Sequence, residues 1–238
     1  MSSIKINLLG IGGAKIDFAG TSIYIDAFNK FIPAQRLNKS DIVLFTHGDD
    51  DHFSAKHTLE CSDKNIIIGP PGIAYPLLAR TGFDPDLLKI VYPSHINTPI
   101  DIELGGIKIK AYQTKHFIDW EPDHISFLFK YMDKRIYFTG DSHTFAWEDQ
   151  EIYDVDALVY SLVYKDVVKG QMSSVDGAQM HIPELKNLQD KLMPKSLIGN
   201  HLLNCDWTVS TDDMKSAIQK AGLKNIIITE SVEEEILI

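Results

Sequence analysis

Cysteine is scarce in this chain, with only Cys61 and Cys205 among 238 residues. One disulfide would be no framework for a protein of this length, and two free thiols are typical of a reducing compartment. The N-terminus lacks a basic region followed by an apolar stretch, so we expect no secretory signal and a cytoplasmic location. No apolar run approaches the ~20 residues of a membrane-spanning helix, so we expect no membrane partner.

Positive charge is also in short supply. Lysine and arginine together number 23 against 33 aspartates and glutamates, which gives a formal net charge of -10. Such a surface repels polyanions at long range, and this argues against a nucleic-acid partner. A bound cation can reverse the field within one pocket, so a small anionic substrate is still an option. The oligomeric state is not indicated.

Strand-like runs rich in Ile, Val, Tyr and Phe recur along the chain, and helical patterns are fewer. We expect strands near residues 4–9, 14–18, 21–25, 41–46, 65–68, 88–92, 106–114, 124–131, 134–139, 156–160, 195–199 and 224–228. Helices are expected near 54–61, 72–80, 182–193 and 211–221. This distribution predicts an α+β fold in a single domain over 1–238. Two mixed β-sheets would pack face to face, with helices on the outer faces.

The most informative segment is the expected strand 41–46 and the six residues after it, His47-Gly48-Asp49-Asp50-Asp51-His52. Five of these six residues can ligate a metal. Adjacent carboxylates repel one another and are costly to bury without a counter-charge, and no Lys or Arg follows until Lys56. A divalent cation would supply that charge, and Gly48 suits a tight loop around it. The alternative is a solvated acidic turn.

Three later strands also end in His or Asp. The expected strand 106–114 leads into Lys115-His116, the strand 134–139 leads into Gly140-Asp141-Ser142-His143, and the strand 195–199 leads into Asn200-His201. Residues just beyond strand ends are where functional loops gather. Four such ends in one chain favour a shared metal site over scattered structural histidines.

The ordered set resembles the metallo-β-lactamase superfamily, whose pattern is His-x-His-x-Asp-His after a strand, followed by a His, an Asp and a final His at later strand ends. The matching residues here are His47, Asp51, His52, His116, Asp141 and His201. The resemblance runs from the N-terminus to about residue 210. It implies an αββα four-layer sandwich, and the layout looks closest to the compact subgroup that includes ascorbate-6-phosphate lactonase.

The resemblance also implies two divalent metal ions, with zinc expected. The first ion would be held by His47, Asp49 and His116. The second ion would be held by Asp51, His52 and His201, and Asp141 would bridge the two. Asp49 stands where the family has a histidine. Two imidazoles and a carboxylate suit zinc and also non-haem iron, so manganese or iron are alternatives.

Several further residues are candidates for roles around the site. His124, His143 and His181 could protonate a leaving group or hold a substrate, and with Asp51 and Asp141 they complete the expected catalytic set. Each of the three could equally be an ordinary polar residue, with His181 placed just before a helix. Other residues could have either a role at the site or an ordinary structural role. They are Asp26, Asp50, Trp120, Trp147, Lys165, Lys169, Cys205 and Trp207.

These observations predict a metal-dependent hydrolase. A metal-activated hydroxide would cleave a small ester, lactone or phosphoester, without a Ser or Cys nucleophile. The first alternative is an iron-dependent oxygenase or oxidoreductase of the same superfamily, which Asp49 keeps open. A nuclease is a second alternative, although the chain shows no basic stripe. A metal-stabilised binding protein is a third.

Overall fold

The computed structural model describes residues 3–62, 64–117, 123–163, 172–203 and 209–238. Its strands form two seven-stranded sheets. The strands of the first sheet are β1 (Lys5–Leu8), β2 (Ala14–Phe18), β3 (Thr21–Ile25), β4 (Ile42–Leu44), β5 (Ile66–Gly69), β6 (Leu88–Ile90) and β14 (Glu235–Leu237). The strands of the second sheet are β7 (Ile100–Leu104), β8 (Ile107–Gln113), β9 (Ile125–Tyr131), β10 (Lys134–Phe138), β11 (Ala157–Ser161), β12 (Ser196–Asn200) and β13 (Ile226–Ile227).

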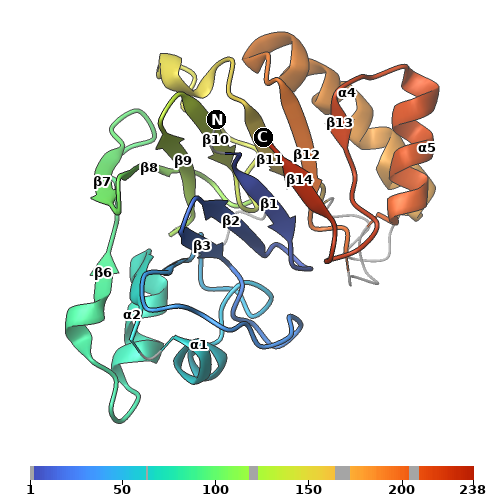
Figure 1. Ribbon diagram of the computed structural model, residues 1–238. Helices are drawn as coiled ribbons and strands as arrows, with labels where there is room; N and C mark the ends of the chain where they lie inside the picture. The colour runs from blue at the N-terminus through green and yellow to red at the C-terminus, as the bar shows by residue number, and fades with distance from the viewer. Residues whose placement is uncertain (1–2, 63, 118–122, 164–171, 204–208) are drawn as a thin grey trace.

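Both sheets are mixed, and each has an antiparallel half and a parallel half. The first sheet has the order β14-β1-β2-β3-β4-β5-β6, antiparallel up to β3 and parallel from β3 onward. The second has the order β13-β12-β11-β10-β9-β8-β7, parallel from β13 to β10 and antiparallel beyond. The two chain ends lie side by side because β14 pairs with β1 (Figure 1).

The layers follow from the alternation of side chains along each strand. In β10, Ile136 and Phe138 join the apolar cluster between the two sheets, whereas Tyr137 faces the helices. Helices α4 (Ser174–Leu192) and α5 (Thr211–Ala221) cover the outer face of the second sheet (Figure 1). Helices α1 (Ala55–Cys61) and α2 (Pro71–Leu78) cover the outer face of the first sheet. The expected arrangement of two mixed sheets with outer helices is confirmed.

The twelve expected strands are present, but the sequence pattern does not predict β7 and β14. Both are edge strands in which acidic residues alternate with apolar ones, and β14 has only three residues, so neither contains a long continuous apolar run. The expected start of the third helix is wrong. Helix α4 begins at Ser174, capped by the Ser173 hydroxyl, and Pro183 lies inside it. His181 is therefore a buried residue within the helix rather than a residue before it.

Two short 3-10 helices, Pro85–Leu87 and Gln150–Ile152, complete the described elements. Among the helices of the described residues, none is both long and apolar enough to cross a membrane.

Candidate metal centre

The candidate residues meet at one edge of the two sheets. Strands β4, β8, β10 and β12 all end there, and β9 begins there, because antiparallel neighbours run in opposite directions. The two sheets are joined at this edge, where the backbone N–H of Ile125 donates to the carbonyl of Thr46 at 2.8 Å. The N–H of Phe117 donates to the carbonyl of Asp141 at 2.9 Å. These bonds fix the positions of the loops that carry the candidate ligands relative to one another.

Two groups of three potential ligands form at this edge, and within each group the ligand atoms lie within 4.8 Å of one another. The first group is His47, Asp49 and His116. Its Asp49 Oδ2 lies 3.7 Å from Nε2 of both histidines. These are the residues that the resemblance implies for a first ion.

The second group is Asp51, His52 and His201. Asp51 Oδ2 lies 3.9 Å from His52 Nε2 and 3.6 Å from His201 Nε2. Burial disfavours the Asp51 carboxylate, but the hydrogen bond from His201 and the nearby His52 lower the pKa of Asp51. The group therefore presents an ionised oxygen and two imidazole nitrogens, a donor set that suits a divalent cation.

Asp141 stands between the two groups. Its Oδ2 lies 3.2 Å from His52 Nε2, 3.4 Å from His201 Nε2 and 3.9 Å from His116 Nε2. Its other oxygen accepts a hydrogen bond from the Ser161 hydroxyl at 2.9 Å. Burial favours the neutral acid, but His201 and His52 hold the pKa of Asp141 well below its ordinary value. One ionised carboxylate oxygen thus faces both groups.

The orientation of His47 fits a metal ligand. The Thr46 hydroxyl donates its single hydrogen to Asp26 Oδ2 at 2.6 Å, so it accepts from His47 Nδ1, which lies 2.8 Å away. The tautomer this leaves has a lone pair on Nε2. That atom is buried and has no hydrogen-bond partner among the described residues. An orphaned acceptor of this kind is costly unless a cation binds it.

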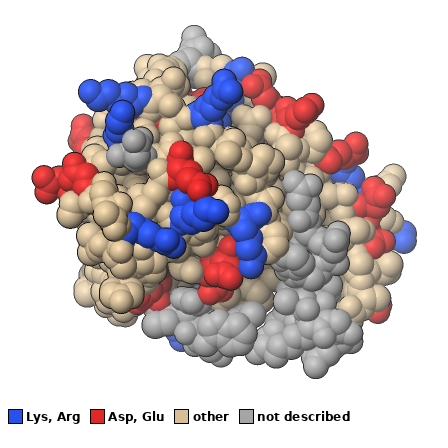
Figure 2. All heavy atoms as spheres, turned by 90° about the horizontal axis from the view of Figure 1, so that it is seen from below, with Lys and Arg blue, Asp and Glu red and all other residues tan. Residues whose placement is uncertain are grey.

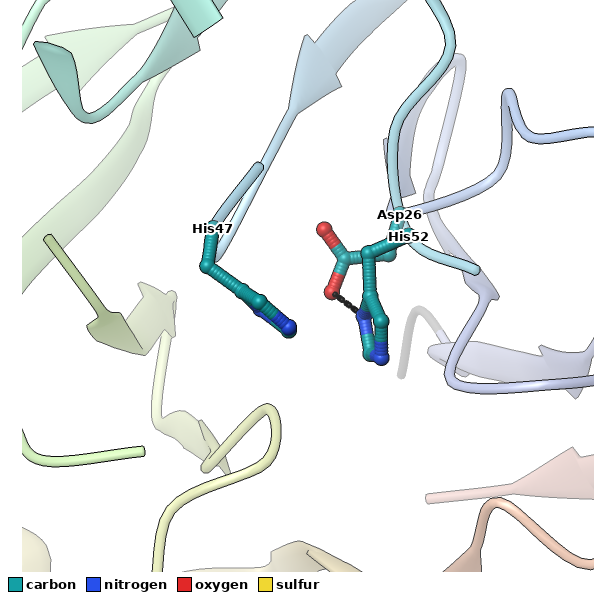
Figure 3. Close-up of side chains that lie close together, drawn as sticks. All are labelled: Asp26, His47 and His52. Atoms are coloured by element: carbon teal, nitrogen blue, oxygen red, sulfur yellow. Dashed lines mark hydrogen bonds and ion pairs between the residues drawn. The ribbon is translucent and has the colours of Figure 1, made fainter. Parts of the chain in front are cut away.

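His52 is held in the same way from the other side. Its Nδ1 lies 2.9 Å from Asp26 Oδ2, a contact drawn as a dashed line in Figure 3. Its Nε2 lies near the carboxylates of Asp51 and Asp141. Burial opposes a charged ring, yet Asp141 and Asp26 raise the pKa of His52 well above its ordinary value. The surroundings therefore stabilise a positive charge at this point. A bound metal ion would supply that charge.

Asp26 is better explained as a support than as a ligand. It lies within ligand distance of His47 and His52 (Figure 3). Its oxygens, however, already accept bonds from the Thr46 N–H, the Thr46 hydroxyl and the His52 ring. Its backbone has a φ of 51°, a left-handed conformation that costs free energy in a non-glycine residue. His201, at the end of β12, has a φ of 72°. Such strain clusters at functional sites.

His124 is bonded at both ring nitrogens. Its Nε2 accepts from the backbone N–H of Asp141 at 3.0 Å, so Nδ1 carries the hydrogen and donates to the Thr114 hydroxyl at 2.8 Å. Thr114 in turn contacts Ser126, which donates to the Thr139 carbonyl at 2.7 Å. Burial lowers the pKa of His124 to about 3. This neutral ring holds the backbone of Asp141 in place and has no nitrogen left for proton transfer.

Glycine is required at two positions around the site. A Cβ at Gly12, where φ is 65°, would lie 2.3 Å from a His52 ring carbon. A Cβ at Gly140, where φ is 57°, would lie 2.8 Å from His124 Nε2. At Gly48 a Cβ would meet only ordinary contacts at 3.7 Å. Gly48 is expected from the sequence to suit a tight loop, but the loop leaves room for a side chain at this position.

Other candidates lie around this centre or outside it. His143 and His181 approach the carboxylate of Glu184 rather than either ligand group. Asp50 points away, with a side chain 87% exposed that pairs with Lys30. Trp147 lies under Lys191, 5.2 Å from ring centre to Nζ. The remaining candidates, Trp120, Lys165, Lys169, Cys205 and Trp207, lie outside the described residues.

Sequence reasoning missed four polar residues around the site. Thr46 and Ser161 are the terminal polar residues of buried, apolar strand segments, and that position is a usable signal. Thr114 has the same position at the end of β8. Glu184 gives no signal, because a glutamate in a helix is ordinary.

Comparison with known proteins gives an independent result. Residues 19–201 match the family model described as a beta-lactamase superfamily domain. A metal-dependent hydrolase from Anoxybacillus flavithermus is 26% identical over 155 residues, which are 60% of this chain. The match spans 65% of that relative's length.

Solved structures show the same fold. A metallo hydrolase from Ignicoccus hospitalis superposes with a TM-score of 0.68 and 16% identity, covering 100% of this chain and 99% of that one. A diiron beta-hydroxylase from Streptomyces venezuelae, CmlA, gives a TM-score of 0.64 and 14% identity, covering 99% of this chain and 54% of that one. With the family match over most of its length, the two mixed sheets and the ligand-bearing loops at their shared edge, the chain belongs to the metallo-β-lactamase superfamily.

Proposed function

We propose that this protein is a metal-dependent hydrolase that cleaves a small ester, lactone or phosphoester. The observation that carries the proposal is Asp141 Oδ2, which lies within 3.9 Å of ring nitrogens from both groups of potential ligands. A single ionised oxygen between two cation sites would hold two ions close together, and closely spaced ions are what a paired-metal hydrolase uses.

In this proposal His47, Asp49 and His116 hold one cation, and Asp51, His52 and His201 hold the other. Two cations bound there would activate a water molecule as nucleophile and polarise the carbonyl or phosphoryl oxygen of the substrate. Asp26 and Thr46 keep Nε2 of both neighbouring histidines directed inward. The Ser161 hydroxyl and the His124 ring fix Asp141 by its side chain and its backbone.

For His124 we propose a role other than the predicted catalytic one. Since both of its ring nitrogens are bonded within the protein, we assign it to positioning rather than to proton transfer. Asp51 and Asp141 are the carboxylates nearest to the ligand nitrogens of the second group, so any proton released there has an acceptor at hand.

Zinc is the metal we propose first, because imidazole and carboxylate ligands in groups of three leave room for water and substrate. Zinc-loaded protein should hydrolyse p-nitrophenyl esters, a lactone or bis(p-nitrophenyl) phosphate. Elemental analysis of protein purified without added metal should find one to two ions per chain. Metal-free protein that retains full activity on the same substrates would refute the proposal.

An iron-dependent oxygenase is the second candidate, and Asp49 favours it. Two imidazoles and one carboxylate form the ligand set typical of non-haem iron. The fold is also that of the diiron beta-hydroxylase named above. Iron in the purified protein, with dioxygen consumption and no hydrolysis, would replace the first proposal by this one.

The surface charge argues against a nuclease. On the face shown in Figure 2, lysine and arginine side chains lie among acidic ones and form no continuous basic stripe in the described part. With a formal net charge of -10, long-range attraction for a polyanion is lacking. A small molecule is therefore the substrate class we propose.

A further inference from the structure

A second polar cluster borders the candidate metal centre. We define the Glu184 cluster as Glu184 and His181 of α4, His143 of the loop after β10, and Tyr160 of β11. Glu184 Oε1 lies 3.6 Å from His143 Nδ1, and Oε2 lies 3.9 Å from His181 Nδ1. Burial and the adjacent Glu184 carboxylate raise the pKa of Tyr160 well above its ordinary value. The carboxylate thus lies among three polar side chains.

An aromatic contact connects this cluster to the metal centre. The Phe117 ring lies 4.7 Å from the His116 ring and stacks on the His143 ring at 6.1 Å. The His143 ring lies 5.3 Å from the Tyr160 ring. His143 is also only two residues from Asp141. The Phe117 ring thus contacts a candidate ligand on one side and the cluster on the other, so the two lie next to each other.

One atom of the cluster is unsatisfied. His143 Nε2 is buried and has no hydrogen-bond partner among the described residues. Because Nδ1 of the same ring faces the Glu184 carboxylate, which only accepts, the hydrogen is on Nδ1 and Nε2 is left as an acceptor. Buried polar atoms without partners are rare in folded proteins and call for an explanation such as a missing ligand.

The cluster also has an unbalanced charge. Among the ion pairs of the described residues, Glu184 contacts only His143 and His181. Burial favours the neutral acid, but the hydrogen bond from His181 and the nearby His143 and Tyr160 lower the pKa of Glu184, so the cluster carries the negative charge of a carboxylate. The side chain of Glu184 is 32% exposed, so a ligand can reach it. An anionic group would be repelled here, and a hydrogen-bond donor would find two acceptors.

We propose that the Glu184 cluster binds the hydrogen-bond-donating end of the substrate, a hydroxyl or an ammonium group. This inference rests on the proposed hydrolase function, since the reacting group is taken to lie at the metal centre. It differs from the sequence expectation of a possibly anionic substrate. Lys165 and Lys169, which could have contacted an anionic group, lie outside the described residues.

The test uses four p-nitrophenyl esters of equal chain length on the zinc-loaded protein. They are the esters of hexanoate, 6-hydroxyhexanoate, 6-aminohexanoate and adipate. We expect kcat/KM to be about tenfold higher for the hydroxyl or ammonium ester than for hexanoate, as one hydrogen bond to a charged group provides. The adipate ester should be the poorest substrate. Equal values for all four esters, or a preference for adipate, would overturn the inference.

The variant Glu184→Gln distinguishes binding of the ammonium group from binding of the hydroxyl group. Gln keeps an acceptor but loses the charge, so the preference for the ammonium ester should fall about tenfold and that for the hydroxyl ester by less than about threefold. Asp190→Asn, which removes an exposed carboxylate from the same helix, should change neither preference. If Glu184→Gln and Asp190→Asn behave alike, the cluster does not bind the substrate end.

Product binding keeps the inference testable if the hydrolase proposal fails. The free acids of the four esters are titrated into the zinc-loaded protein, and the His143 ring signals are followed by NMR. A larger shift with 6-aminohexanoate or 6-hydroxyhexanoate than with hexanoate supports the cluster even without turnover. No difference among the four acids would refute it, whether or not the esters are hydrolysed.

Discussion

The two sheets contribute to the candidate metal centre in different ways. The first sheet supplies its candidate ligands from one loop, residues 47–52, which directly follows a buried strand. The second sheet supplies single candidate ligands from three separate loops, namely His116, Asp141 and His201. The first contribution is local in sequence, whereas the second depends on how β8, β10 and β12 are placed in one sheet.

Neither sheet can assemble a complete group of ligands alone. Asp49 and His47 need His116 from the second sheet, and Asp51 and His52 need His201. Because each proposed ion would be held across both sheets, metal binding would require the sheets to be packed together and would stabilise that packing. One contiguous loop therefore contributes candidate ligands to both groups, and one histidine from the second sheet completes each group.

The largest effect is expected when the shared residue of the second sheet is removed. Asp141→Ala should lower kcat/KM by more than the roughly 10–100-fold that loss of a supporting residue costs, and should reduce the bound metal. Elemental analysis and ester hydrolysis measure both. Asp50→Asn is the matched control in the contiguous loop, since the Asp50 side chain is exposed. Full metal content and activity in Asp141→Ala would contradict the view that the second sheet supplies the residue shared by both groups.

A smaller effect is expected when the support of Asp141 is removed. His124→Ala leaves the buried N–H of Asp141 without its acceptor, which should lower the free energy of unfolding by about 1–3 kcal/mol. Metal affinity should fall by roughly 10–100-fold. Denaturant unfolding and competition with a chelator measure these quantities. His95→Ala, at an exposed histidine, should change neither. An unchanged metal affinity in His124→Ala would contradict the positioning role.

The residues that position candidate ligands in the two sheets can be ranked by their effect on metal affinity. Thr46→Val removes a hydroxyl that bonds both Asp26 and His47, and Ser161→Ala removes one bond to Asp141. Both should lower metal affinity, by about tenfold for Thr46→Val and by less for Ser161→Ala, within the range for supporting residues. Chelator competition on the two variants gives the order. A larger loss in Ser161→Ala would reverse this ranking.

The smallest effect is expected far from the centre, at the opposite end of β11. Burial opposes ionisation of Asp156, but bonds from Lys195, the Arg135 N–H and Lys134 lower its pKa below the ordinary 3.8. This stabilisation is present above about pH 4 and is lost as pH falls through the folded pKa. Asp156→Asn should therefore cost about 1–2 kcal/mol at pH 7 and progressively less below pH 4.

Urea unfolding of wild type and Asp156→Asn at pH 7 and near pH 3 measures this difference. Ester hydrolysis should be unchanged, because Asp156 lies away from the ligand groups. A cost that is constant with pH would mean that the Asp156 charge is not what stabilises this end of the second sheet.

Much of the centre could be predicted from sequence, because ligands next to buried strands leave a visible pattern. The cluster at 47–52 is conspicuous, since adjacent carboxylates need a counter-charge. His116, Asp141 and His201 follow strands whose apolar patterns are clear. The strands themselves were predictable for the same reason, as residues such as Ile136 and Phe138 alternate toward a buried layer.

The roles of the histidines could not be predicted in the same way. His124 and His143 are similar in sequence context, each next to a strand. In the fold, one has both ring nitrogens bonded and the other retains an unpaired buried Nε2. Hydrogen-bond partners such as Thr114 and Glu184 come from distant segments, so they are decided by packing.

The sequence by itself determined the kinds of ligand and the strands that carry them, because both depend on residue type and on the period of apolar side chains. Only the tertiary structure decided which oxygen faces two sets of imidazoles, which carboxylate serves as a support, and where Glu184 stands. Those outcomes depend on distances between loops that are far apart along the chain, and these are set by the register of the two sheets.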